Sequence, residues 1–110
     1  MELNPGKLIR IFVNETDKYR GKPLYEAIVT RCQELKLAGV TVFRGLEGFG
    51  ETAELHRAGL FGGDCPIVIT IVESEEKTRL AVPELQSMMT GGIIAVTDVE
   101  VAVISKMRSC

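Results

Sequence analysis

The sequence predicts a single α+β domain in which helices and strands follow the order β-α-β-loop-β-α-β. Two stretches carry apolar residues at helical spacing, short runs rich in β-branched residues flank them, and glycines mark the junctions. The chain has 110 residues, and 45% of them are hydrophobic, which is ordinary for one globular domain. We therefore expect residues 1–110 to form one unit.

The first part of the chain predicts a strand, a helix and a second strand. Lys7–Asn14 is short and rich in β-branched residues, so we expect a strand there, followed by a charged loop over Glu15–Lys22. Pro23 fits the first turn of a helix, where its missing N–H costs nothing. Gly39 is expected to end this helix, and Val40–Arg44 predicts the second strand.

The middle of the chain predicts a long loop followed by a strand. Glu51–Pro66 shows no clear strand period and is long for a connection in a compact domain, with a helical turn expected within Glu51–Arg57. Ile67–Glu73 is the clearest strand pattern in the sequence. Ser74 follows it as the expected N-cap of a second helix.

The last part predicts this second helix and the final strands. The helix pattern runs to about Met89, and Pro83 is expected to kink it or to restart it. Thr90–Gly92 should end it. Ile93–Lys106 is apolar but long for one strand, so we expect Asp98 to divide it into a fourth strand and a short extra C-terminal strand.

This element order is that of a ferredoxin-like sandwich, an antiparallel sheet with both helices on one face. The other face of such a sheet is normally polar, but here both faces are apolar. In the third strand, Ile67, Ile69 and Ile71 alternate with another apolar set, and Arg10 alone places a charge at a strand centre. We expect another subunit to cover the open face, and infer a homo-oligomer.

A glycine-rich segment follows the second strand and is the best candidate for a ligand site. Arg44 is followed by Gly45, Gly48 and Gly50, and such a backbone can approach a ligand closely and cradle a phosphate with its N–H groups. Arg44 offers a bidentate phosphate contact. The alternative is a twisted strand end with a bulge, and the spacing alone leaves both readings open.

Composition argues against several other classes of protein. The net charge of −2 does not predict nucleic-acid binding, and no apolar run is long enough to span a membrane. The N-terminus lacks the features of a signal peptide, and the three cysteines are not spaced as disulfide or metal pairs. We therefore expect a cytoplasmic protein.

Candidate reactive residues are sparse, so we expect no catalytic residue and no metal site. His56 and Glu54 lie in the long loop, where a solvated histidine is the simplest interpretation. Cys32 falls on the apolar stripe of the first helix, and Cys65 precedes a strand without a nearby histidine. The basic residues before the first helix could meet an anion or could simply be solvated.

Two motifs resemble the PII-like signal-transduction proteins, and in particular the subgroup known as domain of unknown function family 190. The motifs are Gly21–Leu24, which begins the first helix, and Val40–Gly50, which reads Val-Thr-Val-Phe-Arg-Gly-Leu-Glu-Gly-Phe-Gly. The tail Val99–Lys106 is similar to the PII C-terminal strand. The resemblance covers nearly the whole chain.

The resemblance implies a homotrimer that binds an adenine nucleotide (AMP, ADP or ATP) as an effector in clefts between subunits. It implies no cofactor, no enzymatic activity and signalling through the long loop, called the T-loop, to a partner such as a membrane transporter or an enzyme. By position, Thr41 would approach the base and Gly48, Phe49 and Gly50 would lie beneath the phosphates. Gly91, Gly92 and Lys106 would complete this site, with the Gly91–Gly92 turn supplied by the neighbouring subunit, and Arg44 and Gly45 are ligand-binding candidates from the glycine-rich segment itself.

The chain departs from the PII pattern at several phosphate-binding positions. Ile93 and Ile104 replace basic residues, and the glutamine beyond the Gly-Phe-Gly is absent around Glu51. Fewer cations favour a site for short phosphates or weak binding over a full ATP site. The alternative is a small enzyme of the same fold that uses His56 and Glu54. An RNA-binding module is disfavoured, since Ile67–Glu73 has no stacking aromatic residue.

Overall fold

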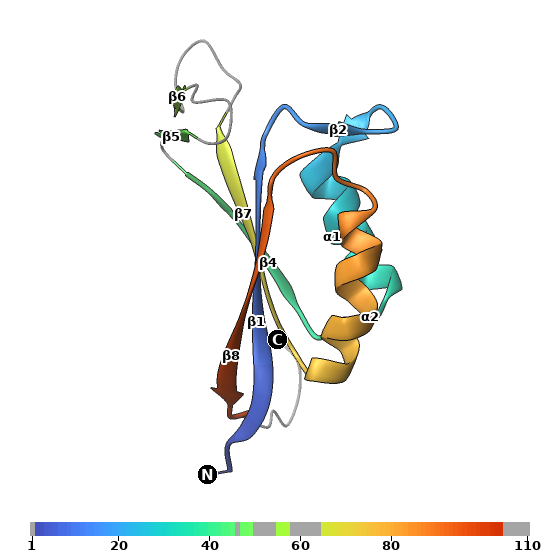
Figure 1. Cartoon of the computed structure of the whole chain (residues 1–110), viewed down its shortest axis with the longest axis vertical. Coiled ribbons are helices and arrows are strands. Elements are labelled where there is room, and N and C mark those ends of the chain that lie inside the picture. The colour runs from blue at the N-terminus through green and yellow to red at the C-terminus, as the bar shows by residue number, and fades with distance from the viewer. Residues whose placement is uncertain (1, 46, 50–54, 58–64, 105–110) are drawn as a thin grey trace.

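The chain folds into one four-stranded antiparallel sheet with two helices packed on a single face (Figure 1). The computed structural model describes residues 2–45, 47–49, 55–57 and 65–104, and only the backbone is described at 47–49 and 55–57. The elements are β1 Asn4–Asn14, β2 Lys18–Tyr19, β3 Lys22–Pro23, α1 Leu24–Glu34, β4 Val40–Arg44, β5 Glu47–Phe49, β6 Leu55–Arg57, β7 Pro66–Glu73, α2 Glu75–Gln86 and β8 Ile93–Val101. The predicted ferredoxin-like arrangement is confirmed.

The core lies between the sheet and the helix layer. The strand order is β4-β7-β1-β8, so β7 and β1 are central and β4 and β8 form the two edges. Alternate residues of the central strands are buried against the helices, because neighbouring side chains of a strand point to opposite faces. The buried core comprises Ile9, Ile11, Val13, Leu24, Ile28, Cys32, Ile67, Ile69, Ile71 and Leu85.

The first helix ends differently from the prediction. The residue with a left-handed backbone is Lys36, at φ 61°, and not Gly39. The N–H of Lys36 donates to the carbonyl of Gln33 at 3.0 Å, and that of Leu37 donates to Cys32 at 3.1 Å. These two bonds form a Schellman motif, which closes the helix three residues before the glycine. The expectation that Gly39 ends the helix is therefore wrong.

The connections around the first helix and after β4 contain short paired strands. The predicted loop Glu15–Lys22 includes a small hairpin in which β2 pairs with β3. After β4, β5 pairs with β6 in antiparallel register. Leu55–Arg57 is thus extended, which corrects the helical turn predicted for that part of the loop, and the rest of the turn lies outside the described residues.

The second helix begins as predicted and continues through its proline. The Ser74 hydroxyl accepts from the N–H of Lys77 at 3.2 Å, which confirms the N-cap. The helix does not restart at Pro83, because Ala81 and Leu85 on either side of it are buried in the core and hold the last turn helical. It ends at Gln86, earlier than the predicted Met89. Neither helix within the described residues is long and apolar enough to cross a membrane.

The last strand is continuous through Asp98, so the predicted division there is wrong. Asp98 lies opposite Lys7 and accepts a hydrogen bond from its ammonium group, so its charge is neutralised within the ladder. The strand also has a longer partner than predicted, because β1 begins at Asn4 and pairs as far as Val101. Residues 102–104 form no strand, and the remainder of the predicted extra strand lies outside the described residues.

Candidate functional site

The residues predicted to bind a ligand fall into two groups on opposite edges of the sheet. The first group lies on β4 and just after it, and the second precedes β8; these are the two edge strands. Gly50 and Lys106 lie outside the described residues. The first group comprises Thr41, Arg44, Gly45, Gly48 and Phe49, and the second comprises Gly91 and Gly92.

Arg44 ends the edge strand β4 with its charge already paired. Its guanidinium donates to the carboxylate of Glu15, the residue that follows β1. The next residue, Gly45, donates from its N–H to the carbonyl of Pro66 at 2.7 Å, and an added Cβ would lie 2.8 Å from Pro66 Cγ. Glycine therefore permits the close approach of the two chains just where the edge strand ends.

Thr41 and the glycines after Gly45 occupy different surroundings. Thr41 is exposed on the sheet face opposite the helices and lies opposite Thr70 of β7. Gly48 and Phe49 belong to β5, where they lie opposite His56 and Leu55 of β6. This backbone is extended and paired with a second strand.

The second group surrounds a hollow at the start of β8. Gly92 has a φ of 107°, and an added Cβ would lie 2.5 Å from the carbonyl oxygen of Phe12. The glycine is thus required for the chain to turn tightly against β1. Next to it is a hollow of about 390 Å³ between the end of α2 and β8, lined by Val82, Gln86, Met89, Thr90, Gly91, Gly92, Ile94 and Val96.

Sequence reasoning missed six of these lining residues, including Ile94 and Val96 of β8. Val82, Gln86 and Met89 recur at helical spacing, which is a signal for one helix face, and Thr90 precedes the glycines. The pattern itself does not say that this face is partly open. That follows from the position of β8 at the edge of the sheet.

Arg44 and the glycines of both groups lie at the same end of the sheet, whereas Thr41 is level with Arg10, nearer the middle. β7 pairs with both β4 and β1, and this pairing places Arg44 level with Val13 of β1. Gly92 comes directly before Ile93, which pairs with Phe12 of β1. Three strand spacings, roughly 14 Å, separate the two edges. One small ligand therefore cannot contact both groups within a single chain. It can do so only where β8 of one copy lies beside β4 of another.

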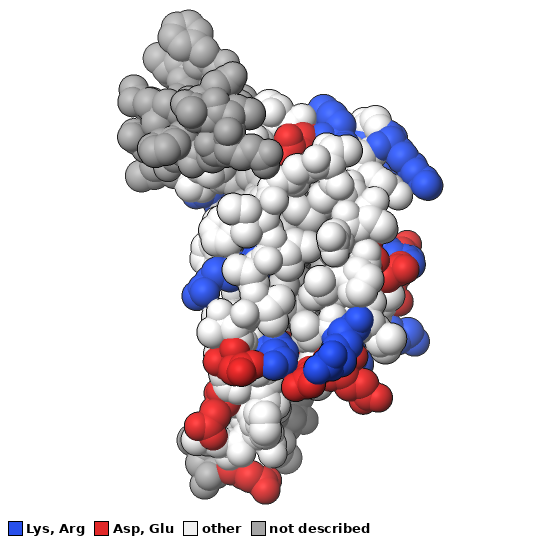
Figure 2. Space-filling view, viewed as in Figure 1, with Lys and Arg blue, Asp and Glu red and all other residues white. Residues whose placement is uncertain are grey.

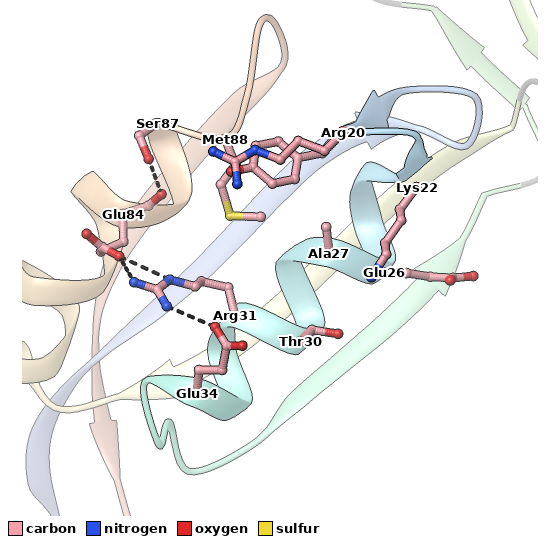
Figure 3. Close-up of a pocket in the computed structure, with 11 residues that line it drawn as sticks. Arg20, Lys22, Glu26, Ala27, Thr30, Arg31, Glu34, Glu84, Ser87 and Met88 are labelled. Atoms are coloured by element: carbon pink, nitrogen blue, oxygen red, sulfur yellow. Dashed lines mark hydrogen bonds and ion pairs between the residues drawn. The ribbon is translucent and has the colours of Figure 1, made fainter.

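A separate groove of about 780 Å³ lies on the helix layer, between α1, α2 and the β2–β3 hairpin (Figure 3). Arg31 crosses it, donating to Glu34 on its own helix and to Glu84 on α2, and these bonds hold the pKa of Arg31 above its usual value. Arg20 enters from the hairpin with its guanidinium 5.1 Å from the centre of the Tyr19 ring. The groove contains none of the predicted ligand residues, and its central cation serves to join the two helices.

The reactive side chains considered from the sequence are not gathered into one site by the structure. Cys32 is fully buried, and burial raises the pKa of its thiol to about 11, so it remains protonated at neutral pH. Cys65 is also buried. His56 lies in β6, while Glu54 lies outside the described residues. Within the part of the chain that the structure describes, no three His, Cys, Asp or Glu side chains form a metal-sized cluster.

Several solved structures to which this chain is similar are those of PII-like signalling proteins. CPII of Thiomonas intermedia K12, a nitrogen regulatory PII-like protein, matches with a TM-score of 0.71 and 19% identity, covering 93% of this chain and 100% of that one. A putative PII-like signalling protein of Thermus thermophilus matches with a TM-score of 0.66 and 23% identity, covering 92% and 93%. The chain therefore has the PII-like fold.

The sequence comparisons identify the family. The chain belongs to the DUF190 family, described as "Uncharacterized ACR", whose model matches residues 6–101. A UPF0166 protein of Aquifex aeolicus is 38% identical over 103 residues, covering 92% of this chain and 97% of that protein. One from Methanocaldococcus jannaschii is 27% identical, covering 87% and 91%. The predicted membership is confirmed.

Proposed function

We propose that the protein is a trimeric PII-like regulator that binds an adenine nucleotide between copies of the chain. In this proposal it acts in the cytoplasm and signals through the segment joining β4 to β7 to a transporter or an enzyme. The observation that carries it is the division of the candidate site between the β4 edge and the β8 edge at one end of the sheet. A heterologous contact that joins unlike edges repeats around an axis and can close into a ring.

Closure of the chains into a ring also accounts for the apolar sheet face that carries no helix. Phe43 and Ile93 are 55% and 61% exposed, and both lie on the face that carries no helix. Figure 2, which views the sheet from its side, shows most charged side chains over the helix layer and toward the lower end. An apolar sheet face of this kind is typical of a surface that another copy covers.

The choice of ligand is supported by the structural neighbours. CPII is described as bound to ADP, AMP and bicarbonate. In this chain the first group would supply Arg44 and the backbone after it, and the second would supply the hollow beside Gly92. With one arginine and no other described cation in either group, we propose AMP or ADP as the preferred ligand over ATP. Binding occurs without conversion of the nucleotide.

Calorimetry with AMP, ADP, ATP and cyclic AMP tests the nucleotide part of the proposal. We expect saturable binding of AMP or ADP, and we expect the nucleotide to be recovered unchanged by chromatography after long incubation. Absence of binding by a well-folded oligomer would refute the nucleotide site, and hydrolysis or isomerisation would favour the enzyme alternative.

Light scattering of two matched variants tests the assembly. Phe43→Asp places a charge on the open face, whereas Leu80→Asp places one on α2, where Leu80 is 68% exposed. We expect Phe43→Asp to yield folded monomers, since an unpaired charge is costly in an apolar interface, and Leu80→Asp to remain oligomeric. A wild-type protein that is monomeric at all concentrations would contradict the proposed ring.

A further inference from the structure

Arg10 occupies the middle of the open sheet face. It lies on the central strand β1, between Thr70 of β7 on one side and Ala95 of β8 on the other. Its neighbours Ile9 and Ile11 are 0% exposed and face the helices, so the side chain of Arg10 points to the opposite face. Arg10 is exposed there, and its side chain makes no hydrogen bond or ion pair with any described residue.

No acidic residue shares this face within the four described strands of the main sheet. The strand carboxylates Glu73 and Asp98 are both aligned with Lys7 and therefore lie on the helix side of the sheet. Glu100 pairs with Pro5, two residues before Lys7, so it also lies on the helix side of the sheet. The open-face residues nearest to Arg10 are neutral: Leu8, Phe12, Val68, Thr70, Val72, Ile93, Ala95 and Thr97.

A line of hydrogen-bonding groups nevertheless crosses this apolar face. Thr41 lies opposite Thr70, and Thr70 lies opposite Arg10, so the two hydroxyls and the guanidinium share one rung of the sheet. The Thr70 hydroxyl has no hydrogen-bond partner among the residues described. Directly opposed side chains in neighbouring strands are close enough to contact one small group together.

Covering this face with further copies would leave the charge of Arg10 without a counter-charge. Copies related by a rotation axis turn the same face toward it, so the open faces of the described main-sheet strands add further Arg10 side chains and no carboxylate. A guanidinium withdrawn from water needs a charged, hydrogen-bonded partner, and its planar fork of donors matches the oxygens of a phosphate.

We propose that the assembled protein binds a small tetrahedral oxyanion of the phosphate type on this face, held by Arg10 and Thr70. The inference rests on the proposed assembly and names a second site, distinct from the nucleotide position beside Arg44 and Gly92. The anion supplies the missing counter-charge, so it stabilises the assembled form over the separate chains.

Thermal unfolding of the full-length oligomer in inorganic phosphate, with chloride at matched ionic strength as the reference, tests this site. We expect saturating phosphate to raise the Tm by about 5 °C. Arg10→Leu and Thr70→Val should lose most of this rise, and Arg10→Lys should keep part of it. Without phosphate, Arg10→Leu should melt above the wild type, because an apolar side chain suits the covered face better than an unpaired charge.

Arg79→Leu is the matched control, because Arg79 is an exposed cation on α2, on the other side of the molecule. It should respond to phosphate as the wild type does. The inference would be overturned if phosphate raised the Tm of Arg10→Leu as much as that of the wild type, or raised the Tm of neither. Dissociation of the Arg10→Leu oligomer would also overturn it, because it would indicate a carboxylate partner from another copy. A nucleotide-binding oligomer indifferent to phosphate refutes this site alone, whereas a monomer refutes the proposed assembly.

Discussion

Arg44 at the end of β4 forms an ion pair with Glu15, the residue that follows β1. The pair joins an edge strand to a central strand at the end of the sheet where the candidate site lies. The Glu15 side chain is 19% exposed and that of Arg44 is 58% exposed, so the arginine retains access to solvent. A phosphate bound beside Arg44 would therefore compete with Glu15 for the same guanidinium.

This competition predicts opposite effects for the two partners. Arg44→Ala should weaken AMP binding roughly tenfold, since a hydrogen bond to a charged group contributes about 1.5–3 kcal/mol. Glu15→Gln should tighten AMP binding a few-fold, because it releases the guanidinium while preserving the size of the side chain. Calorimetric titration measures both changes. Equal affinity in both variants and the wild type would place the phosphate away from Arg44.

The two adjacent glycines before β8 should respond very differently to a methyl group. Gly92→Ala should destabilise the fold by about 2 kcal/mol or more, because it adds a Cβ that lies 2.5 Å from the Phe12 carbonyl at a φ of 107°. An added Cβ at Gly91 meets nothing within 4 Å, so Gly91→Ala should change stability by less than about 0.5 kcal/mol. Urea unfolding of both variants compares them, and equal losses would contradict the tight turn.

Glu73 should be important for stability although it is an acidic residue at the end of a strand. Its carboxylate accepts from the N–H of Ala38 at 2.6 Å and from that of Ser74 at 2.9 Å, joining the loop before β4 to the start of α2. Glu73→Gln replaces an acceptor by a donor and should cost about 1–3 kcal/mol in the free energy of unfolding. The exposed Glu100→Gln serves as the control and should have little effect.

The buried thiol of Cys32 predicts a loss of stability in alkali. Burial raises its pKa from 9.0 to about 11, so above pH 9 the unfolded chain loses this proton while the folded chain keeps it. The stability that the protonated thiol contributes is complete below pH 9 and is lost as the pH rises through about 11. Over this range the free energy of unfolding falls by up to roughly 1.4 kcal/mol per pH unit. Denaturant unfolding of the wild type and of Cys32→Ala between pH 8 and about 11 measures this pH dependence of the free energy of unfolding. An unchanged slope in Cys32→Ala would exclude this cause.

Elements with a strong local pattern could be predicted from the sequence. Val40–Arg44 has the predicted bounds, β7 begins one residue before the predicted Ile67, and Ser74 caps the second helix. Each has a cause within a few neighbouring residues: β-branched composition for the strands and a hydroxyl acceptor for the cap.

The errors occurred where a distant contact overrode the local preference. Asp98 is a poor strand residue, yet Lys7 neutralises it within the ladder. Pro83 stays within a helix because its neighbours are buried in the core. Lys36 adopts the left-handed conformation expected of Gly39, because the Schellman hydrogen bonds and the path toward β4 require it there.

The sequence by itself determined the order of the two helices and the four main strands, the two apolar sheet faces and the glycine turn before β8, because these depend on side-chain type and short-range spacing. Only the tertiary structure decided that Arg44 and Gly92 lie at the same end of opposite edges, and that Arg10 shares a rung with Thr70 and Thr41. Strand order and register arise from contacts between residues distant in the chain, and local spacing does not encode them. The division of the candidate site between the two edges is therefore a property of the fold.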